Sequence, residues 1–166
     1  MKEMEQLHMR NTFLPMDASK LNYQEKNKAL ESLIFLKEKK DGTIKGCACD
    51  DGRKQRVDAK KGDATSLTVS IEAVLITAVI DAKEERDVAV IDIQNSFVQT
   101  EMDNEVLMIM HGRLAELMAA VAPEMYNTYI TIENIIKVLY VKLLMALYGT
   151  LKAALRVYQK LYRDLE

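Results

Sequence analysis

The chain has 166 residues, of which 49% are hydrophobic and 29% are charged, with a formal net charge of −2. This length fits one domain or part of a larger one, and the composition excludes a disordered or fibrous protein. No apolar stretch reaches the roughly 20 residues of a membrane span, and the first ten residues hold no signal core, so the sequence predicts an intracellular protein, in the cytoplasm or nucleus, with no membrane partner.

In the first half of the chain, the spacing of apolar residues and the positions of Gly, Pro and Asp predict the elements. Asp41-Gly42 supplies the tight turn of a hairpin. In chain order, the expected elements are helices over 2–13 and 22–32 with a turn near Pro15 and Asp17, hairpin strands from Leu33 and from Thr43, an exposed loop over 50–65, and a helix over 67–83.

In the second half, short apolar runs rich in β-branched residues predict strands, and apolar residues three and four apart predict helices. The sequence therefore predicts the α+β class, with strands that are not adjacent along the chain. The expected elements are a buried strand over 88–93, a short helix at Phe97 and Val98, a strand over 106–110, a helix over 113–122, a polar stretch over 123–134, a strand over 135–144, and an amphipathic helix over about 150–165.

Two compositional features have simple interpretations. Cys47 and Cys49 are too close in sequence for an unstrained disulfide, and the two histidines are too far away to complete a zinc site, so free thiols are expected. Between Lys37 and Lys61, nine Lys and Arg residues stand against five acids. This basic segment is either a solvated loop or a surface that contacts phosphates, and the sequence leaves both open.

Asp92 is the single charged residue in the apolar run Val88 to Ile93. An ionised carboxylate within a buried strand is costly unless it is paired or bound to a cation. Near the carboxyl end of a strand, such a group either caps a helix or accepts a buried hydrogen bond, or it holds magnesium. Spacing alone favours the structural role.

The wider stretch around Asp92, VIDIQNSFVQTEMD, resembles the first catalytic motif of copia-type retrotransposon reverse transcriptases. In this resemblance, Asp92 matches the metal-binding aspartate. Phe97 matches the aromatic residue beneath the sugar of the incoming nucleotide. The stretch Glu105 to Met108 is similar to the Glu-Val-Tyr-Met strand that follows in the family.

Two further segments are similar to the same family, in the same order. Residues 37–55 resemble its fingers hairpin through Asp41-Gly42, Lys45, Gly52 and Gln55. Residues 140–161 resemble its Leu-Tyr-Gly-Leu-Lys segment once Thr150 is treated as one inserted residue. The matching residues of this last segment are Leu147, Tyr148, Gly149, Leu151, Lys152, Ala154 and Arg156.

The resemblance covers nearly the whole chain and implies an RNA-directed DNA polymerase, a nucleotidyltransferase that uses magnesium. Its implied partners are an RNA or DNA template–primer and deoxynucleotides. The residues that it assigns are Asp92 as catalytic residue and magnesium ligand, Phe97, Lys45 and Arg156 toward the nucleotide, and Arg53, Lys54 and Gln55 toward nucleic acid.

The implied fold is a partial fingers and palm, fingers-like over about 1–85 and an incomplete palm over about 86–166. It has a mixed, mainly antiparallel sheet with packed helices. An incomplete palm leaves a sheet edge open, so self-association is expected unless the extra helix over 113–122 covers that edge.

The sequence also departs from the family. It contains no Tyr-x-Asp-Asp hairpin, which supplies the other two carboxylates of the two-metal reaction. Cys47 stands where the family has an arginine, Ala153 where it has a glutamine and Leu155 where it has a proline. The inserted Thr150 is expected to rotate the following helix by about 100°. These departures favour a fragment that is inactive alone.

Two alternatives to this interpretation stay open. The chain could be a non-catalytic nucleic-acid- or protein-binding module derived from a transposon, retained for its basic hairpin. It could also be the product of a degraded element without a selected function.

Overall fold

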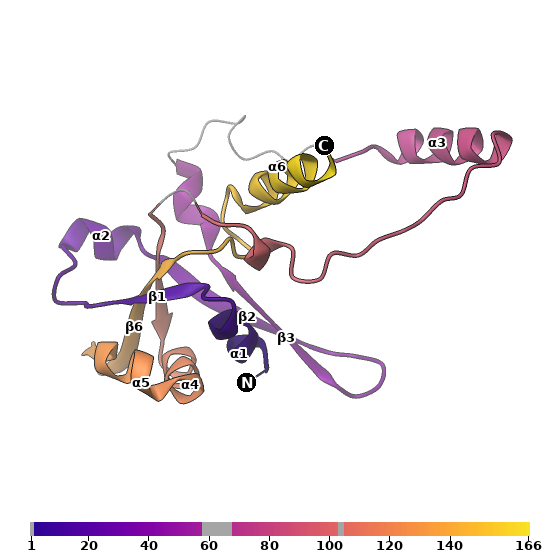
Figure 1. Cartoon of the computed structure of the whole chain (residues 1–166). Coiled ribbons are helices and arrows are strands. Elements are labelled where there is room, and N and C mark those ends of the chain that lie inside the picture. The colour runs from indigo at the N-terminus through magenta and orange to yellow at the C-terminus, as the bar shows by residue number, and fades with distance from the viewer. Residues whose placement is uncertain (1, 58–67, 103–104) are drawn as a thin grey trace.

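The computed structural model describes residues 2–57, 68–102 and 105–166. It shows helices packed on an open, mixed sheet of six strands, which confirms the expected mixture of helix and sheet (Figure 1). The strands are β1 (Phe13–Met16), β2 (Leu30–Glu38), β3 (Ile44–Asp50), β4 (Leu107–His111), β5 (Thr131–Glu133) and β6 (Ile136–Leu143). The helices are α1 (Lys2–Met9), α2 (Tyr23–Lys28), α3 (Ile71–Lys83), α4 (Arg113–Val121), α5 (Pro123–Tyr126) and α6 (Ala153–Leu165), with short 3-10 helices η1 (Gly52–Val57), η2 (Phe97–Gln99) and η3 (Asn127–Tyr129).

The strand order across the sheet is β1-β6-β4-β2-β3, and β5 also pairs with β6. Only β2 and β4 run parallel among these pairs, with Leu30 opposite Met108. The sheet is therefore mixed and mainly antiparallel, as the sequence predicts. The hairpin of β2 and β3 turns at Asp41-Gly42, where the Asp41 carboxylate accepts hydrogen bonds from the backbone and side chain of Thr43.

The central strands β4 and β6 are buried on both faces. Along β6, Leu139 and Val141 point into the larger core cluster, whereas Val138 and Tyr140 point into a smaller one on the opposite face. This alternation follows from the two-residue period of a strand. Helices α1 and α4 contribute side chains to the larger cluster, and the chain around Ala18 and α2 borders the smaller one.

The amino-terminal elements differ from the prediction in a way that packing explains. The first helix ends at Met9, and residues around Pro15 form the edge strand β1 in place of a turn, because proline is tolerated where one side of a strand is unpaired. Helix α2 ends at Lys28, before the predicted 32. Leu30 is only 1% exposed because it continues into β2 and the core.

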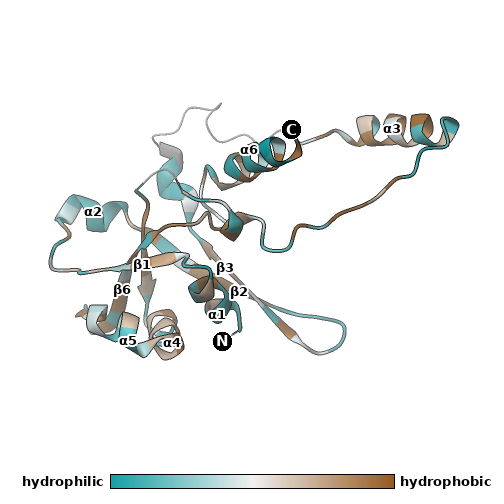
Figure 2. Ribbon diagram, in the orientation of Figure 1, coloured by the Kyte–Doolittle hydropathy of each residue, from teal (hydrophilic) through white to brown (hydrophobic). Residues whose placement is uncertain are grey.

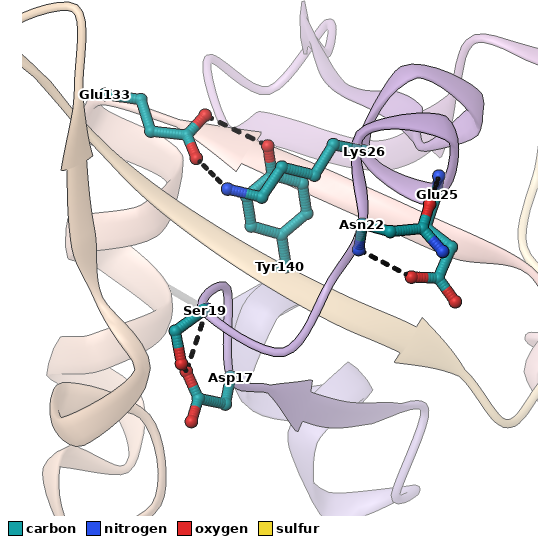
Figure 3. A network of polar contacts seen from close by, with 7 residues as sticks. All are labelled: Asp17, Ser19, Asn22, Glu25, Lys26, Glu133 and Tyr140. Carbon is teal, nitrogen blue, oxygen red and sulfur yellow. Dashed lines mark hydrogen bonds and ion pairs between the residues drawn. The ribbon is translucent and has the colours of Figure 1, made fainter.

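Helix α2 is held at its start and along the side that faces the sheet. Asn22 and Glu25 form a reciprocal capping box at its start. On the side facing the sheet, the Lys26 ammonium lies 2.7 Å from Oε1 of Glu133, and the other carboxylate oxygen of Glu133 accepts a hydrogen bond from the Tyr140 hydroxyl (Figure 3). This network ties α2 to β5 and β6.

The predicted buried strand over 88–93 is wrong. These residues are not in a strand, and Val90 and Ile91 are 97% and 82% exposed. Neither β4 nor β6 has a free edge that this run could pair with. β1 occupies the outer edge of β6, and β2 occupies the outer edge of β4. The apolar run therefore remains outside the sheet (Figure 1).

The remaining predicted elements are present with shifts of a few residues. The loop predicted over 50–65 contains η1, and its part from 58 onward lies outside the described residues, as do Lys60 and Lys61 of the basic segment. Helix α3 begins at Ile71, where the Ser70 hydroxyl accepts a hydrogen bond from the backbone of Ala73. The polar stretch 123–134 forms α5, η3 and β5.

Candidate functional site

Two segments that are distant in sequence meet where β3 ends and the chain turns after β6. The backbone N–H of Asp50 donates to the carbonyl oxygen of Tyr148 over 2.8 Å. A Cβ atom on Gly52 would lie 2.1 Å from the carbonyl oxygen of Gly149, and one on Gly149 would lie 1.9 Å from that of Asp50. Gly149 also has a φ of +102°. Both glycines are therefore required by close backbone contact, and we call this contact the glycine junction.

The glycine junction is closed by two side chains. The Gln55 side-chain oxygen accepts a hydrogen bond from the backbone N–H of Leu151 over 2.8 Å. Thr150 is buried, and its hydroxyl donates to the carbonyl of Leu147. Because α6 begins only at Ala153, Thr150 lies in the turn and not in the helix, so the expected 100° rotation of the helix does not follow from its insertion.

The carboxyl group of Asp50 is buried at the glycine junction. Its side chain is 4% exposed, and neither oxygen has a hydrogen-bond partner among the described residues. Burial, with a smaller contribution from the charge of Asp51, raises the pKa of Asp50 to about 8. Ser32 stands opposite on β2, and its hydroxyl is likewise buried without a partner. Sequence analysis missed this pair because the motif resemblance assigns no role to either residue.

The two thiols lie beside Asp50, on one face of β3, and both are free. Residues two apart on a strand share a face. Burial, followed by the neighbouring Cys47 and Asp50, raises the pKa of the Cys49 thiol to about 11. A thiol with such a pKa stays protonated at neutral pH, so Cys49 is a packing residue and not a nucleophile.

The basic residues assigned to nucleic acid already have partners within the chain. The Arg53 guanidinium hydrogen-bonds both oxygens of Asp51, and these bonds lower the pKa of Asp51 to about 2. The Lys54 ammonium donates to the carbonyl oxygens of Asn27 and Ala29, over 3.2 and 3.0 Å. Lys54 thereby satisfies carbonyl groups at the carboxyl end of α2.

The aromatic residue of the first motif does reach this region. The ring of Phe97 packs against the ring of Tyr148, with centroids 4.1 Å apart. Burial raises the pKa of Tyr148, and the charges of Cys47, Asp92 and Glu3 add to that rise in smaller amounts. Asp92 itself is exposed and does not lie in a buried strand.

The two remaining residues that the resemblance assigns to the nucleotide are Lys45 of β3 and Arg156 of α6. Lys45 is exposed on β3, opposite Lys37 of β2. Five residues separate it from Asp50, which corresponds to roughly 17 Å along an extended strand, so the structure does not bring Lys45 to the glycine junction. Arg156 lies in the first turns of α6, and this helix contacts η2.

A separate groove of about 590 Å³ opens beside α2. Its lining combines apolar side chains with polar ones, among them Lys28, Lys142 and Gln55. Lys142 is paired with Glu105 over 2.7 Å. Gln55 therefore connects this groove to the glycine junction. The apolar lining residues are Met16, Leu21, Leu30, Val106 and Leu107.

Asp92 is the residue that the resemblance assigns as a magnesium ligand. Magnesium requires near-octahedral oxygen coordination and, in the family that the sequence resembles, carboxylates on neighbouring strands. Within the described residues, no group of three or more His, Cys, Asp or Glu side chains is placed to hold a metal. Asp50 and Asp51 belong to the glycine junction, where one carboxyl is enclosed and the other is paired with Arg53.

Comparison with known proteins gives no relative: no protein-family model, curated protein or solved structure matches this chain. Within the residues that the structure describes, no helix has both the length and the apolar character needed to cross a membrane.

Proposed function

We propose that this chain is a fragment of a reverse-transcriptase-type RNA-directed DNA polymerase that binds a template–primer duplex and does not polymerise by itself. The observation that carries the proposal is the glycine junction. It joins Gly52 and Gln55, of the segment that resembles the fingers hairpin, to Gly149 and Leu151 of the segment over 140–161. The ring of Phe97, from the first motif, packs against the neighbouring Tyr148.

The spatial meeting of the motifs supports the proposal because each was identified separately in the sequence. A chance match in one segment has no reason to contact a chance match in another. The contacts use the residues that define the motifs, and both glycines are needed for a steric reason. This support concerns the arrangement of a binding region. For the chemistry of nucleotide addition, the described residues contain no group of three or more His, Cys, Asp or Glu side chains placed to hold a metal.

The surface most available for phosphates is the tip of the β2–β3 hairpin. Lys37 and Lys45 form a cross-strand pair there, and both are exposed. Lysines that neutralise phosphates release counterions, so binding should weaken steeply as salt rises. Arg53 and Lys54 are less available because Asp51 and the α2 carbonyls already engage them.

Binding can be tested by fluorescence anisotropy of a labelled RNA–DNA template–primer at increasing salt. Lys37→Gln with Lys45→Gln should weaken binding and reduce the salt slope by about two, one for each lost phosphate contact. The matched control is Lys20→Gln with Lys160→Gln, which removes the same charge elsewhere and should leave hairpin-specific binding largely unchanged. Equal loss in both double variants, or binding that is indifferent to salt, would contradict the proposal.

Catalysis is tested separately by primer extension with the purified chain, magnesium and deoxynucleotides. No extension is expected, because a lone exposed carboxylate holds magnesium weakly. Templated synthesis by the chain that is abolished by Asp92→Asn would overturn this part of the proposal. The binding experiment is independent of this result and tests template–primer binding separately.

A further inference from the structure

The groove beside α2 has no role in the proposed binding of a template–primer, which uses the tip of the β2–β3 hairpin. Its volume of about 590 Å³ lies within the range of small-molecule sites. The lining comes from the chain over 16–30, from η1, from residues 105–107 at the start of β4, and from Lys142 near the end of β6. Figure 2 shows the mixed character of this region, with α2 in teal and the strands β1 and β6 in brown.

The apolar part of the lining is aliphatic. Leu30 and Val106 are 1% and 8% exposed, so they belong to the core and present a fixed surface to the groove. Among the described residues, no aromatic side chain lines the groove. A flat aromatic ligand gains from stacking on an aromatic ring, whereas aliphatic side chains contact a hydrocarbon chain equally well. The five residues are Met16, Leu21, Leu30, Val106 and Leu107. This lining therefore favours an aliphatic ligand.

Two ammonium groups come together at the carboxyl end of α2. The Lys54 ammonium donates to the carbonyl oxygens of Asn27 and Ala29, which flank Lys28 in the chain. Lys54 is therefore held next to the backbone of Lys28, and both side chains line the groove. Within the described part of the chain, neither lysine forms an ion pair with a carboxylate. An anion in the groove would compensate these two like charges.

The other charged groups of the lining are already engaged. The Lys142 ammonium is paired with Glu105 over 2.7 Å, and the Glu25 carboxylate accepts a hydrogen bond from the backbone of Asn22. Three lysines and two glutamates thus give the lining a net charge of +1, although the whole chain carries −2. A carboxylate matches one excess positive charge, whereas a phosphate monoester carries nearly two negative charges at neutral pH. The charge of the groove therefore favours a carboxylate.

We propose that this groove binds an aliphatic carboxylate, with the hydrocarbon tail along the five apolar side chains and the carboxylate beside Lys28 and Lys54. The tail supplies most of the affinity, because burial of each methylene strengthens binding, and the lysines set the direction of the ligand. The site does not depend on the proposed polymerase ancestry. Neither Lys28 nor the five apolar residues are among those that the resemblance assigns to nucleotide or nucleic acid.

Isothermal titration calorimetry with decanoate, below the concentration at which it forms micelles, tests the site. One decanoate should bind per chain with a saturable isotherm. Octanoate, which is two methylenes shorter, should bind roughly ten-fold more weakly. Decanol, which has the same tail without the charge, should also bind more weakly than decanoate. Absence of saturable binding, or equal affinity for decanoate and decanol, would overturn the proposal.

The head group is tested by Lys28→Gln. This variant should weaken decanoate binding roughly five-fold, as expected for one exposed charge contact, and leave decanol binding unchanged. The matched control is Lys40→Gln, which removes the same charge from the exposed turn between β2 and β3 and should change neither affinity. Equal losses of decanoate affinity in the two variants would show that the carboxylate is not recognised at α2.

The tail is tested by filling the groove. Leu21→Trp places an indole among the apolar lining residues and should weaken both decanoate and decanol by roughly ten-fold or more. Leu36→Trp is the matched control, because Leu36 lies on the hairpin and is 69% exposed, and it should leave both affinities unchanged. Urea denaturation should show that both variants stay folded. A folded Leu21→Trp chain with undiminished affinity would contradict the proposal.

Methyl NMR of the wild-type chain locates the ligand without any substitution. Residues 68–95 also expose apolar side chains and are the main competing surface. Decanoate should shift the methyl signals of Leu21, Leu30, Val106 and Leu107 with the same Kd that calorimetry gives. Shifts confined to methyl groups of residues 68–95, or shifts that never saturate, would overturn the proposal.

Discussion

Two apolar runs of similar composition have opposite fates in this chain. Residues 138–143 lie in β6, where Leu139 and Val141 are fully buried. Residues 88–93 are richer in β-branched side chains but remain outside the sheet. The difference lies in the neighbouring strands. β6 pairs with β4 on one side and with β1 on the other, whereas β1 and β2 occupy both places beside the central pair of β4 and β6 and leave none for 88–93. Strand character therefore depends on an available edge as much as on composition.

The largest expected effect on stability comes from truncating a buried side chain in β6, compared with the same truncation of an exposed side chain in 88–93. Leu139→Ala should lower the free energy of unfolding by about 3–5 kcal/mol, because it leaves a cavity in the core. Ile91→Ala should change it by less than about 0.5 kcal/mol, measured by urea denaturation at concentrations where the chain is monomeric. Similar losses in both variants would show that 88–93 packs as β6 does.

We call residues 68–95, which comprise α3 and the extended segment after it, the arm; in the sequence they lie between η1 and η2. η1 supplies Gly52 and Gln55 to the glycine junction, and Phe97 of η2 packs beside it. Gly149→Ala should destabilise the chain by about 2–4 kcal/mol, because the new Cβ would overlap the Asp50 carbonyl and the residue has a positive φ. Gly42→Ala is the matched control, with a φ of +78° and nothing within 4 Å. It should cost only about 1 kcal/mol. If both variants lowered the melting temperature equally, the close contact of Gly149 with Asp50 would add nothing to the cost of the positive φ.

Asp50 should make the sheet, and not the arm, sensitive to pH. Its pKa is raised from 3.8 to about 8 by burial, so the native state holds the proton more tightly than the unfolded state. Stability should therefore be highest at low pH within this window, fall as pH rises from about 4 to about 8, and level off above. At about pH 9, Asp50→Asn should be more stable than wild type by about 2–4 kcal/mol.

Asp41→Asn serves as the control for this pH dependence. Hydrogen bonds from Thr43 lower the pKa of Asp41, so this residue contributes stability above its ordinary pKa that is lost as pH falls. The contribution of Asp41 to stability therefore rises with pH, whereas that of Asp50 falls. If both variants shifted the pH profile of unfolding in the same direction, the assignment to Asp50 would be wrong.

The smallest expected effect compares one ion pair in each region. Lys26 and Glu133 bridge α2 and β5 at 2.7 Å, and a double-mutant cycle with Lys26→Met and Glu133→Gln should give a coupling of about 1 kcal/mol (Figure 3). In the arm, a guanidinium nitrogen of Arg86 lies 3.5 Å from a carboxylate oxygen of Asp81. Because the Arg86 side chain is exposed to solvent, the coupling of this pair should be smaller. A stronger coupling in the arm would indicate that the arm is held more firmly than its exposure suggests.

Local signals in the sequence were sufficient where one segment determines its own structure. Asp41-Gly42 predicted the hairpin turn, and apolar spacing predicted α4. The same signals failed where a distant segment decides. Pro15 reads as a turn, and only the presence of β6 beside it makes an edge strand. The predicted helix over 22–32 stops early because Leu30 is needed opposite Met108.

The candidate site was predictable in its parts and not in its contacts. The motif resemblance singled out four residues that meet at the glycine junction or beside it. Gly52 and Gly149 do so through backbone contact, Gln55 through its side-chain oxygen and Phe97 through the ring of Tyr148. Gln55 was assigned to nucleic acid, but its side-chain oxygen binds a backbone amide instead. The buried Asp50 had no signal, because burial without a partner depends on the whole fold.

The pairing of β1 with β6 also sets an order of events during synthesis. Phe13 lies opposite Leu143, so the two ends of this ladder are roughly 130 residues apart in the sequence. Closing so long a loop is slow, and contacts of this range delay folding. On a ribosome, the first strand must wait without its neighbour until β6 has emerged. Meanwhile the emerging apolar arm has no covering surface, so early chains are exposed to aggregation and to chaperones.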